Sequence, residues 1–369
     1  MNAVFFLPNL SGGGAERVAL TLLRHLDASQ VHATLILLRK TGVYWDELPS
    51  NVSVIEMSQE GQRIRQGLKE FWKKANPVFE NSDIFIGAEE LDATYYAFGF
   101  AKLFNKPVIG WVHSPIESYL NKVPRYHRIL SRIIYPQLQA LVFPSSGAVQ
   151  SMCSLVRKTN LPVRVISNPI DLETVCAKAS EPLPADFHSI FSKSVVLGIG
   201  RLSAEKGYDV LIRAHALALQ KGHDHNLVIV GEGNERGNLE ALIRDYRLQS
   251  SAFLPGFVAN PYTLLSHSTI FAHPARYEGF GMAVLEALAC GIPVVAAESA
   301  GVSSILDGGK YGIEVPQGNE AKLAAELCRL LDDNELQQQL GRVGPSRAEN
   351  YQVKKVAAAW ENLLLDIVR

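Results

Sequence analysis

Short apolar runs alternate with segments of helical periodicity along almost the whole chain. Several runs are apolar on both faces, which is typical of parallel strands covered by helices on either side. In the segment after Gly14, apolar residues recur at the spacing of one helical stripe. This alternation predicts an α/β fold with parallel sheets. The runs interpreted as strands are 3–7, 33–38, 52–55, 83–87, 107–112, 140–143 and 163–166, and then 195–200, 226–231, 252–256, 269–273 and 293–297.

The alternation restarts in the middle of the chain. Residues 167–194 contain three prolines and no clean periodicity, so this segment is the best candidate for a linker. A chain of 369 residues is long enough for two domains with separate cores. We therefore expect Rossmann-like, doubly wound domains at 1–168 and 169–351. A helix at about 352–369 is a candidate to pack back on the first domain.

Charge and cysteine content argue against several classes of protein. Lys and Arg number 36 and Asp and Glu number 37, a net charge of −1, which disfavours a general nucleic-acid binder. No apolar run approaches the roughly 18–20 residues that cross a bilayer, and residues 1–14 suit a first strand better than a signal peptide. The four cysteines show no C-x-x-C and no paired spacing, so we expect neither a zinc site nor a disulfide framework. These features favour a cytoplasmic protein.

A run of three glycines separates the first expected strand from the first helix. Gly12, Gly13 and Gly14 would let backbone N–H groups approach an anion at the helix N-terminus. The run matches neither the G-x-G-x-x-G fingerprint nor a P-loop, which disfavours a nicotinamide dinucleotide or P-loop site. Taken alone, it is equally compatible with a tight strand-to-helix turn.

A second candidate anion site follows the expected strand 269–273. Gly279 and Gly281 open a helix there, and the first N–H groups of that helix, at about Gly281, Met282 and Ala283, lack intrahelical acceptors. They would point out of the carboxyl end of the strand, where ligands bind in open α/β sheets.

Two carboxylates bracket this turn. Glu278 lies before the helix and Glu286 about two turns into it. Glu286 could be a surface residue of an amphipathic helix, but its neighbours on that face are largely apolar. A carboxylate in such surroundings needs a partner, and ligand hydroxyls would serve.

Basic residues and one histidine also follow expected strands. Arg201 and Lys206 come after 195–200 and before a helix, a placement that suits a diphosphate, although either alone is more typical of a solvated loop. His113 follows 107–112 and precedes a Ser-Pro turn. A lone histidine is more often structural than catalytic.

In chain order, the motifs GGGAERV, VHSP, NPID, GRLSAEKG, GEG, PGF and EGFGMAVLEALACGIPVVA resemble the retaining glycosyltransferases of family 4. The resemblance covers nearly the whole chain. Its most specific part is Glu278 and Glu286 with seven residues between them. It implies the GT-B fold, in which two Rossmann-like domains face a cleft. The motif GGGAERV looks most like bacterial members that extend lipid-linked or cell-surface glycans.

The resemblance implies a role for each matching residue. The donor would be a UDP-sugar, carrying a hexose or N-acetylhexosamine, in the second domain, and the acceptor a lipid-linked oligosaccharide or cell-surface polysaccharide at the first. Cations and helix N–H groups would offset the diphosphate that departs as the leaving group. The residues implied are Arg201, Lys206, Gly281, Met282 and Ala283 for the diphosphate, Glu286 for the ribose, Glu278 and His113 for the sugar, Phe257 and Val258 for the base, and Gly13 and Gly14 for the approach of the first domain.

Retention without an assured protein nucleophile suggests a front-face reaction, in which the donor's own phosphate helps to deprotonate the acceptor hydroxyl. The chain contains no D-x-D. With Arg201, Lys206 and a helix N-terminus available, a divalent ion is not required to offset the diphosphate. We therefore expect neither a metal nor another cofactor.

Two basic stretches of the first half also carry apolar residues, 61–75 and 119–138. Basic residues beside an apolar face are typical of a helix that lies on an anionic membrane surface. Either stretch alone is better explained as an amphipathic helix packed on its own sheet. Two of them in the half expected to bind the acceptor favour peripheral attachment to the inner face of the cell membrane.

Two other functions remain open. A nucleotide-sugar 2-epimerase could use the same architecture, and analysis of products formed from donor alone would distinguish it from a transferase. A non-catalytic sugar-nucleotide-binding partner of another transferase is the third hypothesis, and it would predict loss of the site residues.

Overall fold

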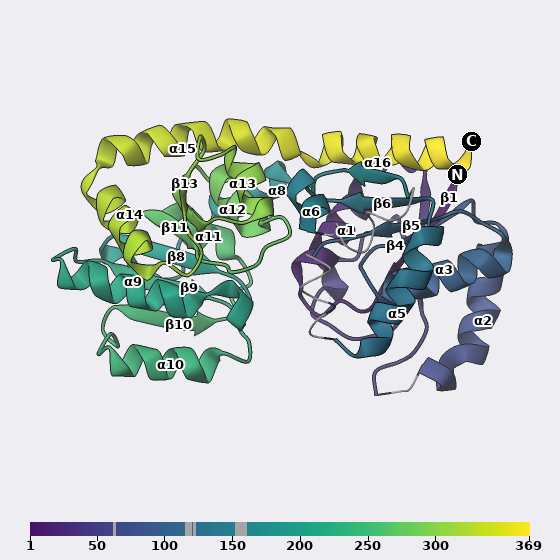
Figure 1. The fold of residues 1–369 in the computed structure, drawn as a ribbon, viewed down its shortest axis with the longest axis horizontal. Helices are drawn as coiled ribbons and strands as arrows, with labels where there is room; N and C mark the ends of the chain where they lie inside the picture. The colour runs from purple at the N-terminus through teal and green to yellow at the C-terminus, as the bar shows by residue number, and fades with distance from the viewer. Residues whose placement is uncertain (62–63, 115–119, 121–122, 152–160) are drawn as a thin grey trace. The chain divides into compact units, whose positions relative to one another are not determined.

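The structure is a computed structural model that describes residues 1–61, 64–114, 120, 123–151 and 161–369. The chain forms two compact units, shown in Figure 1. Met1–Pro169 and Tyr351–Arg369 make the first, and Ile170–Asn350 makes the second. Each unit has its own parallel sheet.

The first unit is built on a seven-stranded sheet in the order β3-β2-β1-β4-β5-β6-β7. Phe5 of β1 lies between Leu35 of β2 and Ile86 of β4. The chain proceeds outward from β1 in both directions, which is the doubly wound arrangement. The strands are β1 (Asn2–Leu7), β2 (His32–Leu37), β3 (Ser53–Glu56), β4 (Ile84–Gly87), β5 (Val108–Trp111), β6 (Ala140–Phe143) and β7 (Val163–Val165).

Helices of the first unit cover the sheet because alternate strand residues point to opposite faces. Val4 and Phe6 of β1 share a core with Phe71 of α2 and Ala97 of α3. The helix α1 packs against α16. The helices are α1 (Gly14–His25), α2 (Ile64–Glu80), α3 (Asp92–Phe104), α5 (Arg125–Ile134), α6 (Ser146–Ser151) and α16 (Val353–Val368), with short 3-10 turns η1 (Trp45–Glu47) and η2 (Tyr135–Gln137).

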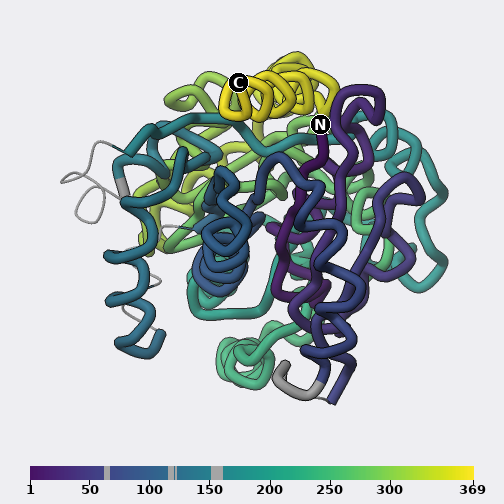
Figure 2. The backbone as a smooth tube through the Cα atoms, turned by 90° about the vertical axis from the view of Figure 1, so that its right-hand side faces the viewer, coloured from purple at the N-terminus to yellow at the C-terminus, as the bar shows by residue number. Residues whose placement is uncertain are grey.

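The C-terminal helix α16 is part of this first unit. The Trp360 ring lies 4.5 Å from the Trp111 ring of β5, centroid to centroid, and both side chains are fully buried. The Glu361 carboxylate accepts a hydrogen bond of 2.7 Å from the backbone N–H of Asp27. Figures 1 and 2 accordingly show both ends of the chain on the same unit.

The second unit is built on a six-stranded sheet in the order β10-β9-β8-β11-β12-β13. Leu197 of β8 lies between Val228 of β9 and Phe271 of β11. This sheet is therefore also doubly wound, with its middle at β8. The strands are β8 (Val195–Ile199), β9 (Asn226–Val230), β10 (Ala252–Gly256), β11 (Ile270–His273), β12 (Val294–Ala297) and β13 (Ile313–Val315).

Helices also cover this second sheet. Ile229 of β9 shares a core with Leu211 of α9 and Leu327 of α14, while α12 packs against α8, α11 and α15. The helices are α8 (Leu172–Ala179), α9 (Tyr208–Gln220), α10 (Arg236–Asp245), α11 (Pro261–His267), α12 (Met282–Ala289), α13 (Ala300–Leu306), α14 (Glu320–Asp332) and α15 (Asn334–Ala348), with η3 (Ala185–Phe187), η4 (Ile190–Ser192), η5 (Ala204–Lys206) and η6 (Glu349–Tyr351).

The predicted α/β class with two doubly wound parallel sheets is confirmed. The prolines of segment 167–194 suggested a linker, but much of this segment forms regular structure packed on the second unit. Asp171 caps α8 by accepting from the Thr174 N–H at 3.1 Å, and the Lys178 carbonyl accepts from Asn260 and Thr263 of a neighbouring segment. In the described parts of the chain, no helix combines the length and apolar character needed to cross a bilayer.

Candidate active site

The site residues predicted in the second unit follow the carboxyl ends of its strands. Arg201 comes after β8, Phe257 after β10 and Glu278 after β11. Because all strands of this sheet are parallel, these ends share one edge of the sheet. The chain thus gathers residues that are far apart in sequence at one edge.

The loops after β8 and β9 lie against each other, and glycine makes this possible. Gly231 has φ of +140°, and a Cβ there would lie 2.0 Å from the Gly200 carbonyl oxygen. The Leu202 N–H donates to the Glu232 carbonyl at 2.8 Å. This backbone contact fixes the turn that carries Arg201. The Arg201 side chain is exposed, and its guanidinium has no partner among the residues that the structure describes.

Lys206 and Glu278 form an ion pair within this edge. The Lys206 Nζ donates to Glu278 Oε2 at 2.6 Å, and both side chains are largely buried. Their loops are also joined through the backbone, since the Arg276 N–H donates to the Glu205 carbonyl at 2.8 Å. Gly207 is left-handed with φ of +66°, and a Cβ there would meet the Pro274 carbonyl at 2.2 Å. The two loops can approach this closely only with glycine at that position.

His273 is a third member of this cluster and was missed by the sequence analysis. Its Nε2 lies 3.2 Å from the same oxygen, Glu278 Oε2. Burial by itself raises the pKa of Glu278, but the Lys206 ammonium and the His273 ring outweigh it and hold that pKa well below its usual range. Glu278 is therefore an anion at neutral pH. The sequence could have pointed to His273, because it is the last residue of a predicted strand and so lies at the carboxyl end of the sheet.

The helix α12 begins at this edge. Its N-cap, Gly281, is left-handed with φ of +105°, and the Leu285 N–H donates to its carbonyl at 3.1 Å. The N–H groups of Met282 and Ala283, in the first turn, have no acceptor four residues back within the helix. Both residues are half-buried. The helix presents its positive end at the edge where Glu278 and Lys206 lie.

Glu286 has a protein partner, so its burial alone does not call for a ligand. It lies on the buried side of α12 and is 6% exposed. The Tyr262 hydroxyl of α11 donates to Glu286 Oε1 at 2.9 Å. No sequence spacing connects Tyr262 with Glu286, so this contact follows only from the packing of α11 on α12.

Phe257 and Val258 lie at the end of β10. Gly256, the last residue of this strand, is left-handed with φ of +88°. Phe257 is 63% exposed and Val258 is half-buried. A large aromatic ring on this edge offers a flat apolar surface to a planar base.

In the first unit, Gly13 and Gly14 lie at the carboxyl end of β1, where Gly13 is the N-cap of α1. A Cβ at Gly13 would lie 2.2 Å from Glu16 Oε2, whereas a Cβ at Gly14 would have no atom within 4 Å. An alanine at Gly13 would therefore have to displace the end of the Glu16 side chain. An alanine at Gly14 would displace no described atom, so local packing does not account for this glycine.

His113 follows β5 on the same edge of the first sheet. Its Nε2 lies 3.1 Å from the Ala88 carbonyl, which can only accept, so Nε2 carries the proton. Burial lowers the pKa of His113 despite the nearby Glu90 carboxylate, so the ring is neutral. Its Nδ1 is buried without a partner in the described structure. A neutral ring of this tautomer offers Nδ1 as an acceptor for a ligand hydroxyl.

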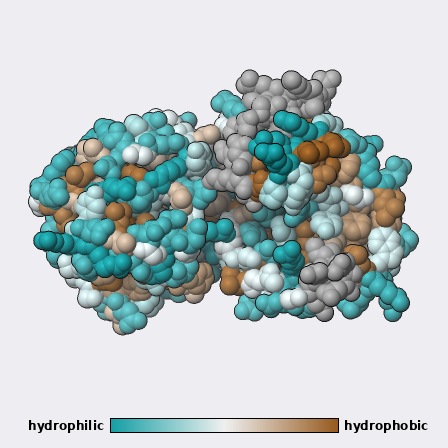
Figure 3. All heavy atoms as spheres, turned by 60° about the horizontal axis from the view of Figure 1, so that its bottom comes forward, coloured by the Kyte–Doolittle hydropathy of each residue, from teal (hydrophilic) through white to brown (hydrophobic). Residues whose placement is uncertain are grey.

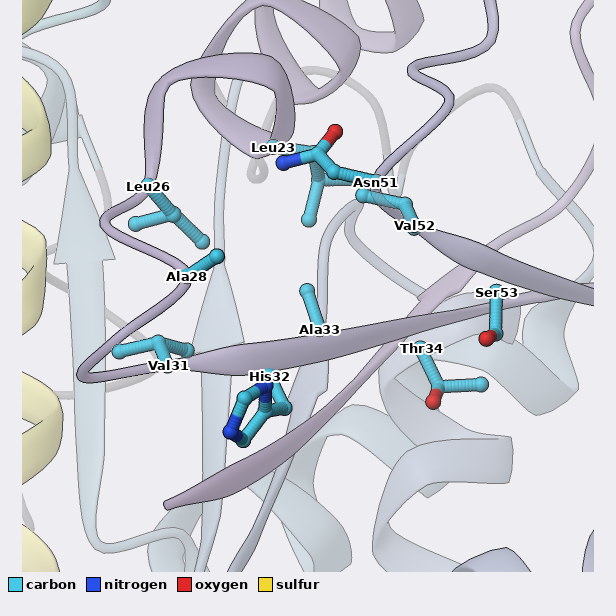
Figure 4. Close-up of a pocket in the computed structure, with 10 residues that line it drawn as sticks. All are labelled: Leu23, Leu26, Ala28, Val31, His32, Ala33, Thr34, Asn51, Val52 and Ser53. Atoms are coloured by element: carbon cyan, nitrogen blue, oxygen red, sulfur yellow. The ribbon is translucent and has the colours of Figure 1, made fainter.

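Two cavities lie within the units, apart from these residues. A cavity of about 160 Å³ lies between α1 and the starts of β2 and β3, the edge opposite the carboxyl ends (Figure 4). A larger one of about 330 Å³ is lined by Ser203, Tyr208 and Arg276, beside the loop that follows β8. The described residues also hold no group of three or more His, Cys, Asp or Glu side chains placed to bind a metal ion.

Two family models match successive parts of the chain. Residues 12–174 match the model described as Glycosyltransferase Family 4. Residues 186–347 match the model described as Glycosyl transferases group 1.

Curated relatives align along nearly the full chain. A protein of Campylobacter jejuni named N-acetylgalactosamine-N,N'-diacetylbacillosaminyl-diphospho-undecaprenol 4-alpha-N-acetylgalactosaminyltransferase is 29% identical over 363 residues, which are 95% of this chain and 96% of that protein. A second C. jejuni protein, named GalNAc-alpha-(1->4)-GalNAc-alpha-(1->3)-diNAcBac-PP-undecaprenol alpha-1,4-N-acetyl-D-galactosaminyltransferase, is 27% identical and covers 100% of this chain and 99% of its own.

Solved structures share the fold at lower identity. HepE of Anabaena in complex with UDP-glucose superposes with a TM-score of 0.81 at 19% identity, over 99% of this chain and 100% of HepE. Sucrose-phosphate synthase of Thermosynechococcus elongatus gives 0.79 at 18% identity, over 99% and 98% of the two chains. Both are GT-B proteins, so the likeness supports the GT-B architecture. Together with the two family models, it shows that this chain belongs to the GT-B glycosyltransferases that combine a Glycosyltransferase Family 4 domain with a Glycosyl transferases group 1 domain.

Proposed function

We propose that this protein is a retaining, metal-independent glycosyltransferase that moves a hexose or N-acetylhexosamine from a UDP-sugar to a lipid-linked oligosaccharide or cell-surface polysaccharide. The observation that carries the proposal is the group formed by Lys206, Glu278 and the N-terminus of α12 at one sheet edge. The choice of acceptor is supported by relatives whose names include undecaprenol-linked glycans. The choice of donor is supported by HepE, which has a similar fold and was solved with UDP-glucose.

The diphosphate of the donor would bind between cations and helix N–H groups. Arg201 is exposed and unpaired in the described structure, and Lys206 already faces an anion. The N–H groups of Met282 and Ala283 add the positive end of α12. These groups offset charge that grows on the leaving diphosphate as the glycosidic bond breaks.

The two glutamates would bind hydroxyl groups on either side of the diphosphate. Glu286 would accept from the ribose, while Tyr262 holds its other oxygen. Glu278 is anionic and would accept from hydroxyls of the transferred sugar. In the first unit, His113 would offer Nδ1 as an acceptor for a sugar hydroxyl. In the second unit, Phe257 and Val258 would contact the base.

The reaction itself is proposed to be front-face transfer. The acceptor oxygen bonds to the anomeric carbon on the face from which the diphosphate leaves, and the acceptor proton passes to a phosphate oxygen of that leaving group. Glu278→Gln tests whether its carboxylate is a nucleophile. A variant that retains the wild-type transfer rate excludes that role.

Metal independence is part of the proposal, because protein cations take the place of a divalent ion at the diphosphate. We expect full transfer in the presence of EDTA. Strong inhibition by EDTA that Mg²⁺ or Mn²⁺ restores would contradict it.

The deciding experiment is a thermal-shift screen of UDP, GDP and their sugars, followed by a transfer assay with an undecaprenyl-diphosphate-linked acceptor. A donor at 100 times its dissociation constant adds about 2.7 kcal/mol of stability. Release of UDP together with a lengthened acceptor supports the proposal. A new sugar formed from donor alone would identify an epimerase, and binding without turnover would identify a non-catalytic partner.

We also propose that the first unit attaches to the inner face of the membrane, chiefly through α5. Tyr126, Ile129 and Ile133 are each more than half exposed on this helix. Arg125, Arg128 and Arg132 are exposed beside them, whereas His127, Ser131 and Ile134 face inward. An apolar stripe next to a basic stripe fits a helix lying on anionic lipid, at about 1 kcal/mol per basic residue.

The other basic stretch is packed more tightly on its own unit. Phe71 and Phe79 of α2 are buried, and the Trp72 ring lies 6.2 Å from the Phe100 ring of α3. Only Leu68 and Trp72 leave a large apolar side chain exposed on the part of α2 whose side chains are described. Residues 62–63 of this stretch, and 119 and 121–122 of the other, lie outside the described residues. Figure 3 shows apolar residues beside hydrophilic ones on the visible face of the first unit.

Sedimentation with liposomes tests this attachment. We expect binding to vesicles containing phosphatidylglycerol, little binding to pure phosphatidylcholine, and loss of binding in the double variant Ile129→Ser, Ile133→Ser. Leu103→Ser on α3 is the matched control, because Leu103 is 64% exposed and lies on another helix. Equal sedimentation with both lipids would remove the proposal.

A further inference from the structure

His273 and Lys206 converge on a single oxygen of Glu278. The distance to Glu278 Oε2 is 3.2 Å from His273 Nε2 and 2.6 Å from Lys206 Nζ. The second oxygen, Glu278 Oε1, has no partner among the residues described. The carboxylate is thus held by one oxygen and open at the other.

The two groups that hold Glu278 differ in how firmly they are fixed. Lys206 lies on a short 3-10 turn, and its long side chain is 26% exposed. The His273 side chain is only 3% exposed, and its backbone pairs with Ala296 inside the sheet. A ligand at this edge can therefore draw Lys206 away, but it cannot move His273 without disturbing β11.

We infer that His273 is a positioning residue, which holds Glu278 Oε2 when Lys206 turns to the donor diphosphate and so keeps Oε1 directed at the transferred sugar. The inference rests on the proposed function, in which Lys206 meets the diphosphate and Glu278 meets the sugar. Without His273, the departure of Lys206 would leave the Glu278 carboxylate without an anchor among the described residues. The sugar would then lose a fixed acceptor, while the nucleotide would keep all of its contacts.

Three variants separate these effects. His273→Leu removes the ring N–H with a side chain that fits a buried site, and His273→Gln retains an N–H donor near the position of Nε2. His188→Leu is the matched control, because His188 is exposed and lies in the second unit before β8, away from the carboxyl edge. Thermal unfolding of each variant establishes that it is folded.

The affinities for UDP and for the UDP-sugar selected by the screen above are the first measurement. A hydrogen bond to a charged group contributes about 1.5–3 kcal/mol, which corresponds to roughly a 10- to 100-fold change. We expect His273→Leu to weaken the UDP-sugar by about tenfold or more and UDP by less than about twofold. His273→Gln should recover most of the loss, and His188→Leu should match the wild type.

The second measurement is the transfer rate in a double-mutant cycle with Glu278→Gln. If His273 acts through Glu278, His273→Leu causes no further loss of kcat in the Glu278→Gln background. An equal loss in both backgrounds overturns the inference, as does a loss of UDP affinity equal to that of the UDP-sugar. Failure of the wild type to bind UDP would instead overturn the proposed function, and the inference with it.

Discussion

Two adjacent glycines of the first unit are expected to respond in opposite ways to the same added methyl group. A Cβ at Gly13 would lie 2.2 Å from Glu16 Oε2, and Glu16 is itself buried. A Cβ at Gly14 would meet no atom within 4 Å, and Gly14 begins α1 with helical backbone. Gly13→Ala therefore displaces a buried carboxylate, and Gly14→Ala displaces no protein atom.

The magnitudes follow from helix energetics. Alanine is a poor N-cap compared with glycine, and displacing the Glu16 carboxylate weakens its interaction with the positive end of α1. Gly13→Ala should therefore destabilise the protein by about 1 kcal/mol. Gly14→Ala should stabilise it by about 0.4–1 kcal/mol, because alanine loses less backbone entropy on folding. In a unit of this size, each kcal/mol shifts the Tm by about 2–4 °C.

Activity should change in the other direction at Gly14. If this turn approaches the donor diphosphate or the acceptor, the new methyl group keeps the ligand away, and a displacement of about 1 Å can cost about 100-fold in rate. The assays are thermal unfolding and initial transfer rate for both variants. A Gly14→Ala protein that is stabilised and fully active would refute the role of this turn in ligand approach. One that is destabilised would refute the local structural argument.

Three further outcomes are expected from the second unit. Tyr262→Phe should weaken UDP binding by about 5- to 20-fold, measured by calorimetry, because Glu286 loses the hydroxyl that orients it; unchanged affinity would contradict this role. Arg201→Ala should weaken UDP by about tenfold and leave uridine unaffected, since the guanidinium is assigned to the diphosphate; equal losses for both would count against that assignment. Burial, with a smaller effect of His225, lowers the pKa of His215 from 6.5 to about 3. Between these two pH values, His215 is protonated in the unfolded chain and neutral in the native state. Stability is then complete above pH 6.5 and falls by about 2 kcal/mol by pH 5, and denaturant titration should show a shallower fall for His215→Gln.

The fold could be predicted because each strand carries its own signal. The runs that form β1, β4 and β8 are apolar on both faces, which only a sheet covered on two sides can bury. The strand β13 was missed because it has three residues and includes Glu314, so it resembles a loop. The strand β13 is placed by its pairing with β12. The local pattern of apolar residues gives no sign of this pairing.

The sequence predicts those site residues that directly follow a strand, but not the contacts that they make. Arg201, Glu278 and His113 follow strands, and parallel topology brings such positions to one edge within each unit. The contacts that orient the site carboxylates join segments far apart in the sequence. Tyr262 reaches Glu286 from another helix, and Lys206 reaches Glu278 across 72 residues of sequence. Such pairs depend on packing angles and rotamers, for which a single sequence gives no signal.

The charge balance of the Lys206 and Glu278 pair connects the proposed function with the role of His273. In the structure, Glu278 compensates the Lys206 charge. The positive groups that remain available to a diphosphate at this edge are the Arg201 guanidinium and the N-terminus of α12. A diphosphate brings about two negative charges, and Lys206 is a further cation of this edge that it could share. As that sharing grows, Glu278 loses part of its compensation and becomes a stronger acceptor for the sugar hydroxyls. Binding of the diphosphate should therefore tighten the hold on the sugar, and a UDP-sugar should bind with more than the summed free energies of its parts. A diphosphate analogue that fails to raise the affinity for the free sugar would contradict this coupling.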